Sequence, residues 1–336
     1  MGSMRLNKKG YPIAVGIYLF VILLTFIIKN DYYFVMLCQI SCYYIAALGV
    51  NLITGLSGLP NLGAAGVFSL GAYTSALFCL RLGWTPLLAI FPVLFASWCI
   101  GKLLGYPSLR IQGVYLSLST MVFAEVVRIL MMNMTELTGG AAGLKGVPVY
   151  NLFGFKLLKY NHTVLVYATV ALFMSYLSNR IIRSRWGRSF VAIRDNVEAV
   201  GSCGIKASYV KVTAFTVCCL FIGVGGAMYG HYARYIAPAS FSQVLSSNLV
   251  VSLILGGIGT VSGTLAGAVM VTILPEIAKV IGQYYMLAYV TVIMLSIIFV
   301  PGGLIPVLFK IKGGITSHDL IKSFLATGKT GGNRND

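Results

Sequence analysis

The chain has 336 residues, of which 58% are hydrophobic and only 10% are charged. Soluble domains carry about 25% charged residues, so this composition excludes a protein whose whole surface faces water. The net charge of +17 reflects a scarcity of acids, and most Lys and Arg residues flank apolar runs. This distribution argues against nucleic acid as a partner and favours a protein embedded in membrane lipid.

Apolar runs of near-membrane length recur along the chain. Residues 1–10 form a short N-terminal segment, in which Met1-Gly2-Ser3 before Met4 resembles a cloning remnant. The runs predict up to ten spans, at 11–28, 33–54, 62–82, 86–105, 112–134, 162–180, 211–233, 244–258, 264–281 and 285–309. Several are short or interrupted by glycine, so some are expected to be re-entrant.

The fold class predicted from these runs is all-α, a polytopic membrane bundle of about 8–10 transmembrane helices over residues 11–309. A polar, disordered tail is expected over 310–336. Of the 25 Lys and Arg residues, seventeen fall on one side of the predicted membrane, seven on the other and one, Arg128, within a span. The richer side is expected to be cytoplasmic, which puts both termini in the cytoplasm of a multi-pass protein.

One cytoplasmic loop, 181–210, predicts a short amphipathic helix. Between Arg188 and Val200 the apolar residues recur at helical spacing, at Phe190, Val191, Ile193, Val197 and Val200. Gly201 and Gly204 suit the end of such a helix. Two interpretations stay open for it: docking of a soluble partner, or contact with anionic lipid headgroups.

The same loop carries a motif that resembles the coupling segment of branched-chain amino-acid permeases, the membrane subunits of ATP-binding-cassette importers. The matching residues are Gly187, Arg188, Ala192, Ile193, Arg194, Asn196, Ala199, Gly204 and Ile205, while Val200 stands where the family usually has alanine. Four further stretches resemble the family, in its order: Leu62-Gly63 with Leu70-Gly71-Ala72-Tyr73, Gly113-Val114-Tyr115 with Phe123-Ala124-Glu125, Leu137-Thr138-Gly139-Gly140, and Leu255-Gly256-Gly257-Ile258-Gly259. The resemblance covers about residues 45 to 305 and fits the LivM-type subunit better than the LivH-type.

The resemblance implies a transport permease domain that carries a coupling segment at about 185–206, in the inner membrane of a bacterium. The implied partners are a LivH-like second permease, two cytoplasmic ATPases and an extracytoplasmic binding protein. The chain itself is expected to be a transport permease and no enzyme. It has no phosphate-binding loop of its own, so ATP hydrolysis is expected in the separate partner subunits. No cofactor is expected, and the scattered histidines predict no metal site.

Polar residues and glycines within the spans are candidates for a translocation pathway: Asn51, Asn61, Gly63, Glu125, Gly256, Gly257 and Gly259. Close helix packing is the alternative explanation for each glycine. An internal ion pair with Arg128, three residues along the helix, is the alternative for Glu125.

Three other functions are left open by the sequence. Closely similar permeases carry urea or short amides. A stand-alone secondary transporter would suit glycine-broken helices, but it would need more intramembrane acids than this chain offers. A membrane-embedded enzyme would need a catalytic constellation, which the sequence does not suggest.

Overall fold

The computed structural model describes residues 16, 31–111, 113–152, 155–156 and 160–299. The longer described helices are α2 (Asp31–Val50), α3 (Ala64–Leu82), α4 (Ile90–Gly105), α5 (Val114–Asn133), α7 (Tyr160–Arg183), α8 (Arg185–Asp195), α10 (Ala207–Ala233), α11 (Gln243–Gly256), α12 (Val261–Ala278) and α13 (Tyr285–Phe299). The short elements are η1 (Asn51–Leu56), η2 (Pro107–Leu109), α6 (Thr135–Thr138), η3 (Gly140–Ala142), β1 (Leu144–Lys145), β2 (Asn151–Leu152), β3 (Phe155–Lys156), α9 (Val197–Ser202), β4 (Tyr235–Ile236), η4 (Pro238–Phe241) and η5 (Lys279–Tyr284).

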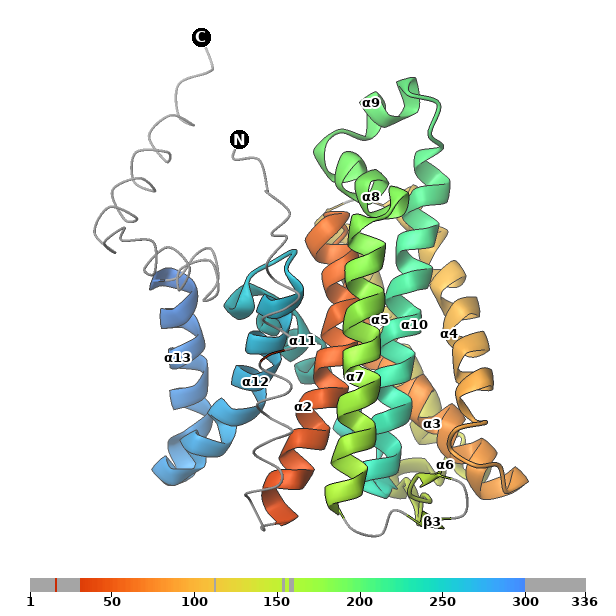
Figure 1. The fold of residues 1–336 in the computed structure, drawn as a ribbon, viewed down its shortest axis with the longest axis vertical. Helices are drawn as coiled ribbons and strands as arrows, with labels where there is room; N and C mark the ends of the chain where they lie inside the picture. Colours follow the sequence, from red (N-terminus) through yellow and green to blue (C-terminus); the bar gives the residue numbers. More distant parts are fainter. Residues whose placement is uncertain (1–15, 17–30, 112, 153–154, 157–159, 300–336) are drawn as a thin grey trace.

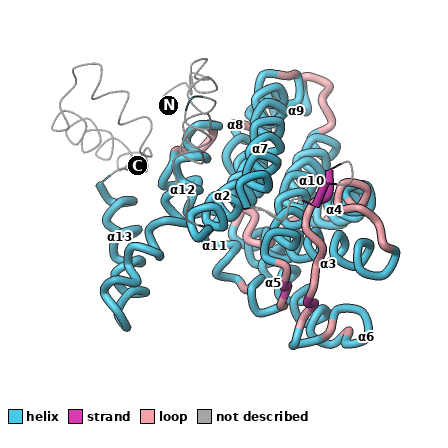
Figure 2. Tube along the Cα trace, turned by 60° about the horizontal axis from the view of Figure 1, so that its bottom comes forward, coloured by secondary structure: helices cyan, strands magenta, loops and turns pink. Residues whose placement is uncertain are grey.

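Seven of the described helices are long and apolar enough to cross a membrane: Tyr32–Leu56, Ala64–Leu82, Ile90–Leu109, Val114–Asn133, Thr163–Arg183, Ala207–Ala233 and Val261–Ala278. At about 1.5 Å per residue, even the shortest of them approaches the thickness of a bilayer core. The strands are short pairs in loops, as Figure 2 shows. The all-α, polytopic fold class is therefore confirmed. The predicted span 11–28, apart from residue 16, and the tail 310–336 lie outside the described residues.

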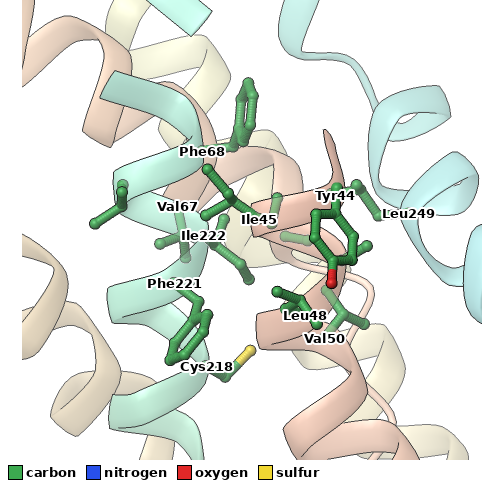
Figure 3. Packing of buried hydrophobic residues seen from close by; sticks show 14 of the residues in the cluster. Tyr44, Ile45, Leu48, Val50, Val67, Phe68, Cys218, Phe221, Ile222 and Leu249 are labelled. Carbon is green, nitrogen blue, oxygen red and sulfur yellow. The ribbon is translucent and has the colours of Figure 1, made fainter. Parts of the chain in front are cut away.

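The bundle is organised around α10, which packs against α2, α3 and α4 (Figure 1). Gly49 of α2 faces Cys218 of α10, whereas Cys42 faces Gly225, so these two helices run in opposite directions. Small residues at the crossings let the helix backbones approach closely. Figure 3 shows Ile45 and Leu48 of α2 packed against α10 in the apolar core.

The outward faces of the bundle are also apolar. On α4, Phe91 and Phe95 are each 67% exposed, and on α5, Tyr115 is 76% exposed. Such side chains on a continuous helical surface suit contact with lipid or another membrane subunit, and they do not suit water.

Two of the crossings are interrupted inside the bundle. Residues 57–63 are irregular before α3 begins, and β4 and η4 precede α11, which has only 14 residues. The starts of these helices lie together, because the Ala65 amide donates to Ser246 Oγ (2.9 Å) and Gln243 Nε2 donates to the Leu62 carbonyl (3.3 Å). Side chains thus satisfy backbone groups that an unbroken helix would pair internally.

The end of the bundle opposite α8 is closed by the loop after α5. β1 pairs antiparallel with β4, and the His231 ring of α10 lies 2.7 Å from both Ser75 Oγ and the Pro148 carbonyl oxygen. These contacts tie the glycine-rich loop to α3 and α10.

Candidate functional site

The predicted coupling segment lies at one end of α7 and α10 (Figure 1) and contains two helices. Ser184 Oγ accepts hydrogen bonds from the Trp186 and Gly187 amides and begins α8. Asn196 then leaves helical geometry, with φ −160° and ψ 112°, and its Oδ1 caps α9 by accepting from the Glu198 (2.9 Å) and Ala199 (3.1 Å) amides. The prediction of one continuous helix from 188 to 200 is therefore wrong, because asparagine favours a cap position.

Buried side chains anchor the segment to the bundle. Phe190 is fully buried and Ile193 is 3% exposed, as the apolar spacing predicts. Gly187 is packed so closely against the end of α7 that an added Cβ would overlap the Ile182 carbonyl oxygen. Val200 holds α9 in the same way, at 5% exposed. Phe190 and Ile193, on the apolar face of α8, are thus covered by the protein itself, while Trp186 is 40% exposed.

The outward face of the segment is polar, with apolar side chains at its edge. Arg188, Glu198 and Ala199 are exposed. Val197 is 38% exposed, although the continuous-helix prediction put it on the buried face. The break at Asn196 turns Val197 outward. Helical periodicity along the sequence therefore failed to identify Val197 as a surface residue. Gly204 follows α9 with φ +76°, a conformation that glycine adopts without strain.

Arg194 points back toward the membrane-spanning helices. Its Nη1 donates to the Gly55 carbonyl oxygen over 3.0 Å, across 139 residues of sequence. Gly58, at φ +66°, lies beneath the same side chain, and a Cβ there would be 2.8 Å from Arg194 Cγ. The motif residue Ala192 serves inside the segment, where its carbonyl accepts from the Asn196 amide.

Asn51 and Gly55 both lie against the turn between α11 and α12. The Asn51 side chain is fully buried, and its Oδ1 accepts from the Gly259 amide over 2.8 Å. Gly257 and Gly259 have φ +119° and +82°, which this tight turn requires. A Cβ on Gly256 would overlap the Gly263 carbonyl oxygen, so close packing of α11 on α12 accounts for that glycine.

Asn61 and Gly63 form a separate group at the start of α3. Asn61 Oδ1 accepts from the Gly63 amide (2.8 Å), and its Nδ2 lies 3.6 Å from Cys218 Sγ. Gly63 packs against the backbone of Thr120 in α5. The predicted pathway residues other than Glu125 therefore fall into two groups, one at the α11–α12 turn and one at this helix start.

Glu125 belongs to neither group, because its hydrogen bonds go to Arg128. Arg128 Nε donates to both Glu125 carboxylate oxygens at 3.0 Å, so the predicted ion pair is present. The pair remains accessible, with 45% of the Glu125 side chain and 26% of the Arg128 side chain exposed. Among the described residues, no three His, Cys, Asp or Glu side chains gather as a metal site would need.

The interrupted apolar helices define a polytopic α-helical membrane protein. The profile of the family described as "Branched-chain amino acid transport system / permease component" matches residues 32–300, and the chain belongs to this family.

Known relatives agree with this assignment. The chain is 34% identical over 300 residues to the high-affinity branched-chain amino acid transport system permease protein LivM of Escherichia coli (strain K12), covering 81% of this chain and 70% of the relative. It is 23% identical over 316 residues to the probable branched-chain amino acid transport permease protein LivM of Methanocaldococcus jannaschii, covering 79% and 90%. The autoinducer 2 import system permease protein LsrC of Yersinia pseudotuberculosis serotype O:3 (strain YPIII) is 24% identical over 231 residues, covering 67% and 60%. No solved structure matches the chain. The LivM-type resemblance inferred from the motifs is confirmed.

Proposed function

We propose that this chain is the membrane-spanning permease subunit of an ATP-binding-cassette importer for branched-chain amino acids. The anchored α8–α9 segment carries the proposal, because it presents an exposed polar face at one end of the bundle while its apolar side chains hold it in place. The names of the relatives at 34% and 23% identity support the substrate class. ATP hydrolysis falls to two cytoplasmic ATPase subunits, and an extracytoplasmic protein captures the substrate.

The burial of α8 favours a protein partner over lipid headgroups. A helix that rests on a membrane surface buries its apolar face in the lipid. In α8 this face is occupied, since Phe190 and Ile193 are buried within the chain. The exposed side is formed by charged residues beside Trp186, which is 40% exposed, and Val197 and Ile205, each 38% exposed. A mixed surface of this kind suits docking to a soluble ATPase subunit.

We infer that α5 faces the second, LivH-like permease. Ionisable side chains within a span seldom face lipid, because exposing charge to hydrocarbon is costly. The partly exposed Glu125–Arg128 pair lies on α5, surrounded by exposed apolar residues such as Val122, which is 61% exposed. A partner subunit over this face would shield the pair, and the translocation pathway would then run between the two permeases. The excess of Lys and Arg supports a cytoplasmic position for α8, α9 and both termini, in a bacterial inner membrane.

The test is reconstitution with the products of the neighbouring genes. The chain is co-expressed with them, purified in mild detergent and inserted into liposomes, and ATP turnover is measured with the binding protein plus leucine or urea. We expect an ATPase to co-purify and leucine to raise turnover several-fold. Absence of an ATPase would overturn the importer assignment, and a response to urea alone would overturn the substrate.

Docking is tested at Val197 and Glu198, which are exposed at the start of α9. The double variant Val197→Asp with Glu198→Arg is expected to retain at least ten-fold less co-purifying ATPase than the parent protein. Lys145→Glu, an exposed charge change in β1, serves as the control and is expected to retain the ATPase. Arg194 and Asn196 are unsuitable for this purpose, because they bond to Gly55 and cap α9. Equal retention of the ATPase by the parent protein, the double variant and Lys145→Glu would refute docking at α9.

A further inference from the structure

The end of α2 is a π-helix, η1, that lies between α8 and the α11–α12 turn. π-Helical turns are rare and frequently occur at functional sites. Five of the six η1 residues are buried, so the segment lies within the packed bundle. It therefore touches both neighbours through specific polar contacts.

The first contact joins η1 to α8. The last carbonyl groups of a helix lack partners within the helix, and a cation is favoured beside them. Arg194 supplies both a donor and a positive charge through its 3.0 Å bond to the Gly55 carbonyl oxygen. Because Ile193 is buried next to it, a displacement of α8 would move this guanidinium group as well.

The second contact joins η1 to the α11–α12 turn. Asn51 Oδ1 accepts from the Gly259 amide (2.8 Å), and its Nδ2 lies 3.5 Å from the Thr260 carbonyl oxygen. Thr260 Oγ1 in turn caps α12 by accepting from the Gly263 amide. Gly55 has no side chain between these groups, and a Cβ there would overlap Asn51 Oδ1 and lie 3.1 Å from the Gly259 nitrogen. Gly55 therefore connects the two contacts. Its carbonyl oxygen accepts from Arg194, and its Cα lies against the α11–α12 turn that Asn51 binds.

We propose that Arg194, Gly55 and Asn51 form a linkage that transmits displacement of α8 through the π-helical end of α2 to the α11–α12 pair. This inference rests on the proposed coupling role of α8. Arg194 and Asn51 are positioning residues in this mechanism: they act through backbone groups and touch no substrate. The tight packing of α11 on α12, where Gly267 abuts Ser252, lets the pair respond as one body.

The first test uses the purified chain alone, so it does not depend on any partner. Hydrogen exchange is measured on peptides covering 253–262 in Arg194→Ala and Arg194→Lys. Loss of the guanidinium contact is expected to speed exchange of the Gly259 amide by about five-fold or more, because opening of the turn becomes easier. Arg188→Ala is the control, since the Arg188 side chain donates to the Arg183 carbonyl oxygen at the end of α7. Unchanged exchange in Arg194→Ala would overturn the linkage.

The second test uses the reconstituted transporter and reads leucine transported per ATP hydrolysed. Arg194→Ala and Asn51→Ala are each expected to keep the ATPase bound and its basal rate within about two-fold of the parent, while transport per ATP falls about ten-fold. Arg194→Lys is expected to recover part of the loss. Transport per ATP in the double variant is expected to be no lower than in the more impaired single variant, because both residues act in one linkage.

The outcomes separate the two proposals. Failure of the parent protein to co-purify with an ATPase would refute the proposed function. Hydrogen exchange on the chain alone would still test the contact between Arg194 and the α11–α12 turn. Release of the ATPase by Arg194→Ala only would assign Arg194 to docking and overturn the linkage. Additive losses in the double variant, or an unchanged transport ratio, would also overturn it.

Discussion

Gly49 of α2 faces α10 with no side chain between the two backbones. A Cβ at this position would lie 2.7 Å from the Cys218 carbonyl oxygen, 2.8 Å from Phe221 Cβ and 3.3 Å from Ile222 Cγ1. Carbon atoms pack favourably at about 3.5–4.0 Å, so Gly49→Ala would force the two helices apart by about 0.7 Å or more. Two of the three obstructing atoms are a backbone oxygen and a Cβ, neither of which can rotate away.

The expected cost of Gly49→Ala is about 2 kcal/mol, the middle of the range for overpacking a close-packed core. At about 2–4 °C per kcal/mol, the scale for domains of about 150–250 residues, the melting temperature in detergent should fall by about 4–8 °C. The assay is thermal unfolding followed by the monodisperse fraction on size-exclusion chromatography. Gly201→Ala is the matched control, because nothing lies within 4 Å of its added Cβ.

The control separates packing from helix propensity. Alanine is a better helix former than glycine, so both substitutions gain the same local term, and only Gly49→Ala meets a neighbouring helix. Equal melting temperatures for the two variants would show that α2 and α10 do not cross at Gly49. The packing of α10 as the centre of the bundle would then be wrong.

Two further predictions concern local contacts. Asn196→Ala should destabilise α9 by about 1 kcal/mol and speed amide exchange at Glu198 and Ala199, whereas Asn196→Ser should preserve the cap; equal exchange in both variants would contradict the capping assignment. Glu125→Gln should lower the melting temperature by about 2–4 °C, because it leaves Arg128 unpaired in a span. The charge swap, Glu125→Arg with Arg128→Glu, should recover more than half of this decrease in melting temperature. A swap that is no better than the single change would show that the pair contributes no stability.

Local sequence patterns predicted most of the fold. The predicted spans 33–54, 62–82 and 112–134 agree within two residues with Tyr32–Leu56, Ala64–Leu82 and Val114–Asn133. Long apolar runs determine such helices because a backbone in lipid must pair its own amides and carbonyls. The short span at 244–258 also corresponds to a short helix, Gln243–Gly256. Motif order was sufficient to identify the family.

The candidate site was only partly predictable from the sequence. Periodicity correctly buried Phe190 and Ile193, because helical spacing is a local property. It missed the break at Asn196 and the exposure of Val197, because the choice between continuing and capping a helix depends on competing hydrogen bonds. Sequence spacing separated Glu125 from Arg128 by three residues, and the structure pairs them as expected.

By itself, the sequence determined that this chain is an α-helical membrane permease of the branched-chain amino acid transport family. Only the tertiary structure decided which polar residues meet. The Arg194–Gly55 and Asn51–Gly259 bonds join positions 139 and 208 residues apart. Composition and periodicity describe neighbours along one helix, whereas these bonds depend on how several helices pack together. The π-helical end of α2 likewise lies between two such bonds, from Arg194 to Gly55 and from Gly259 to Asn51.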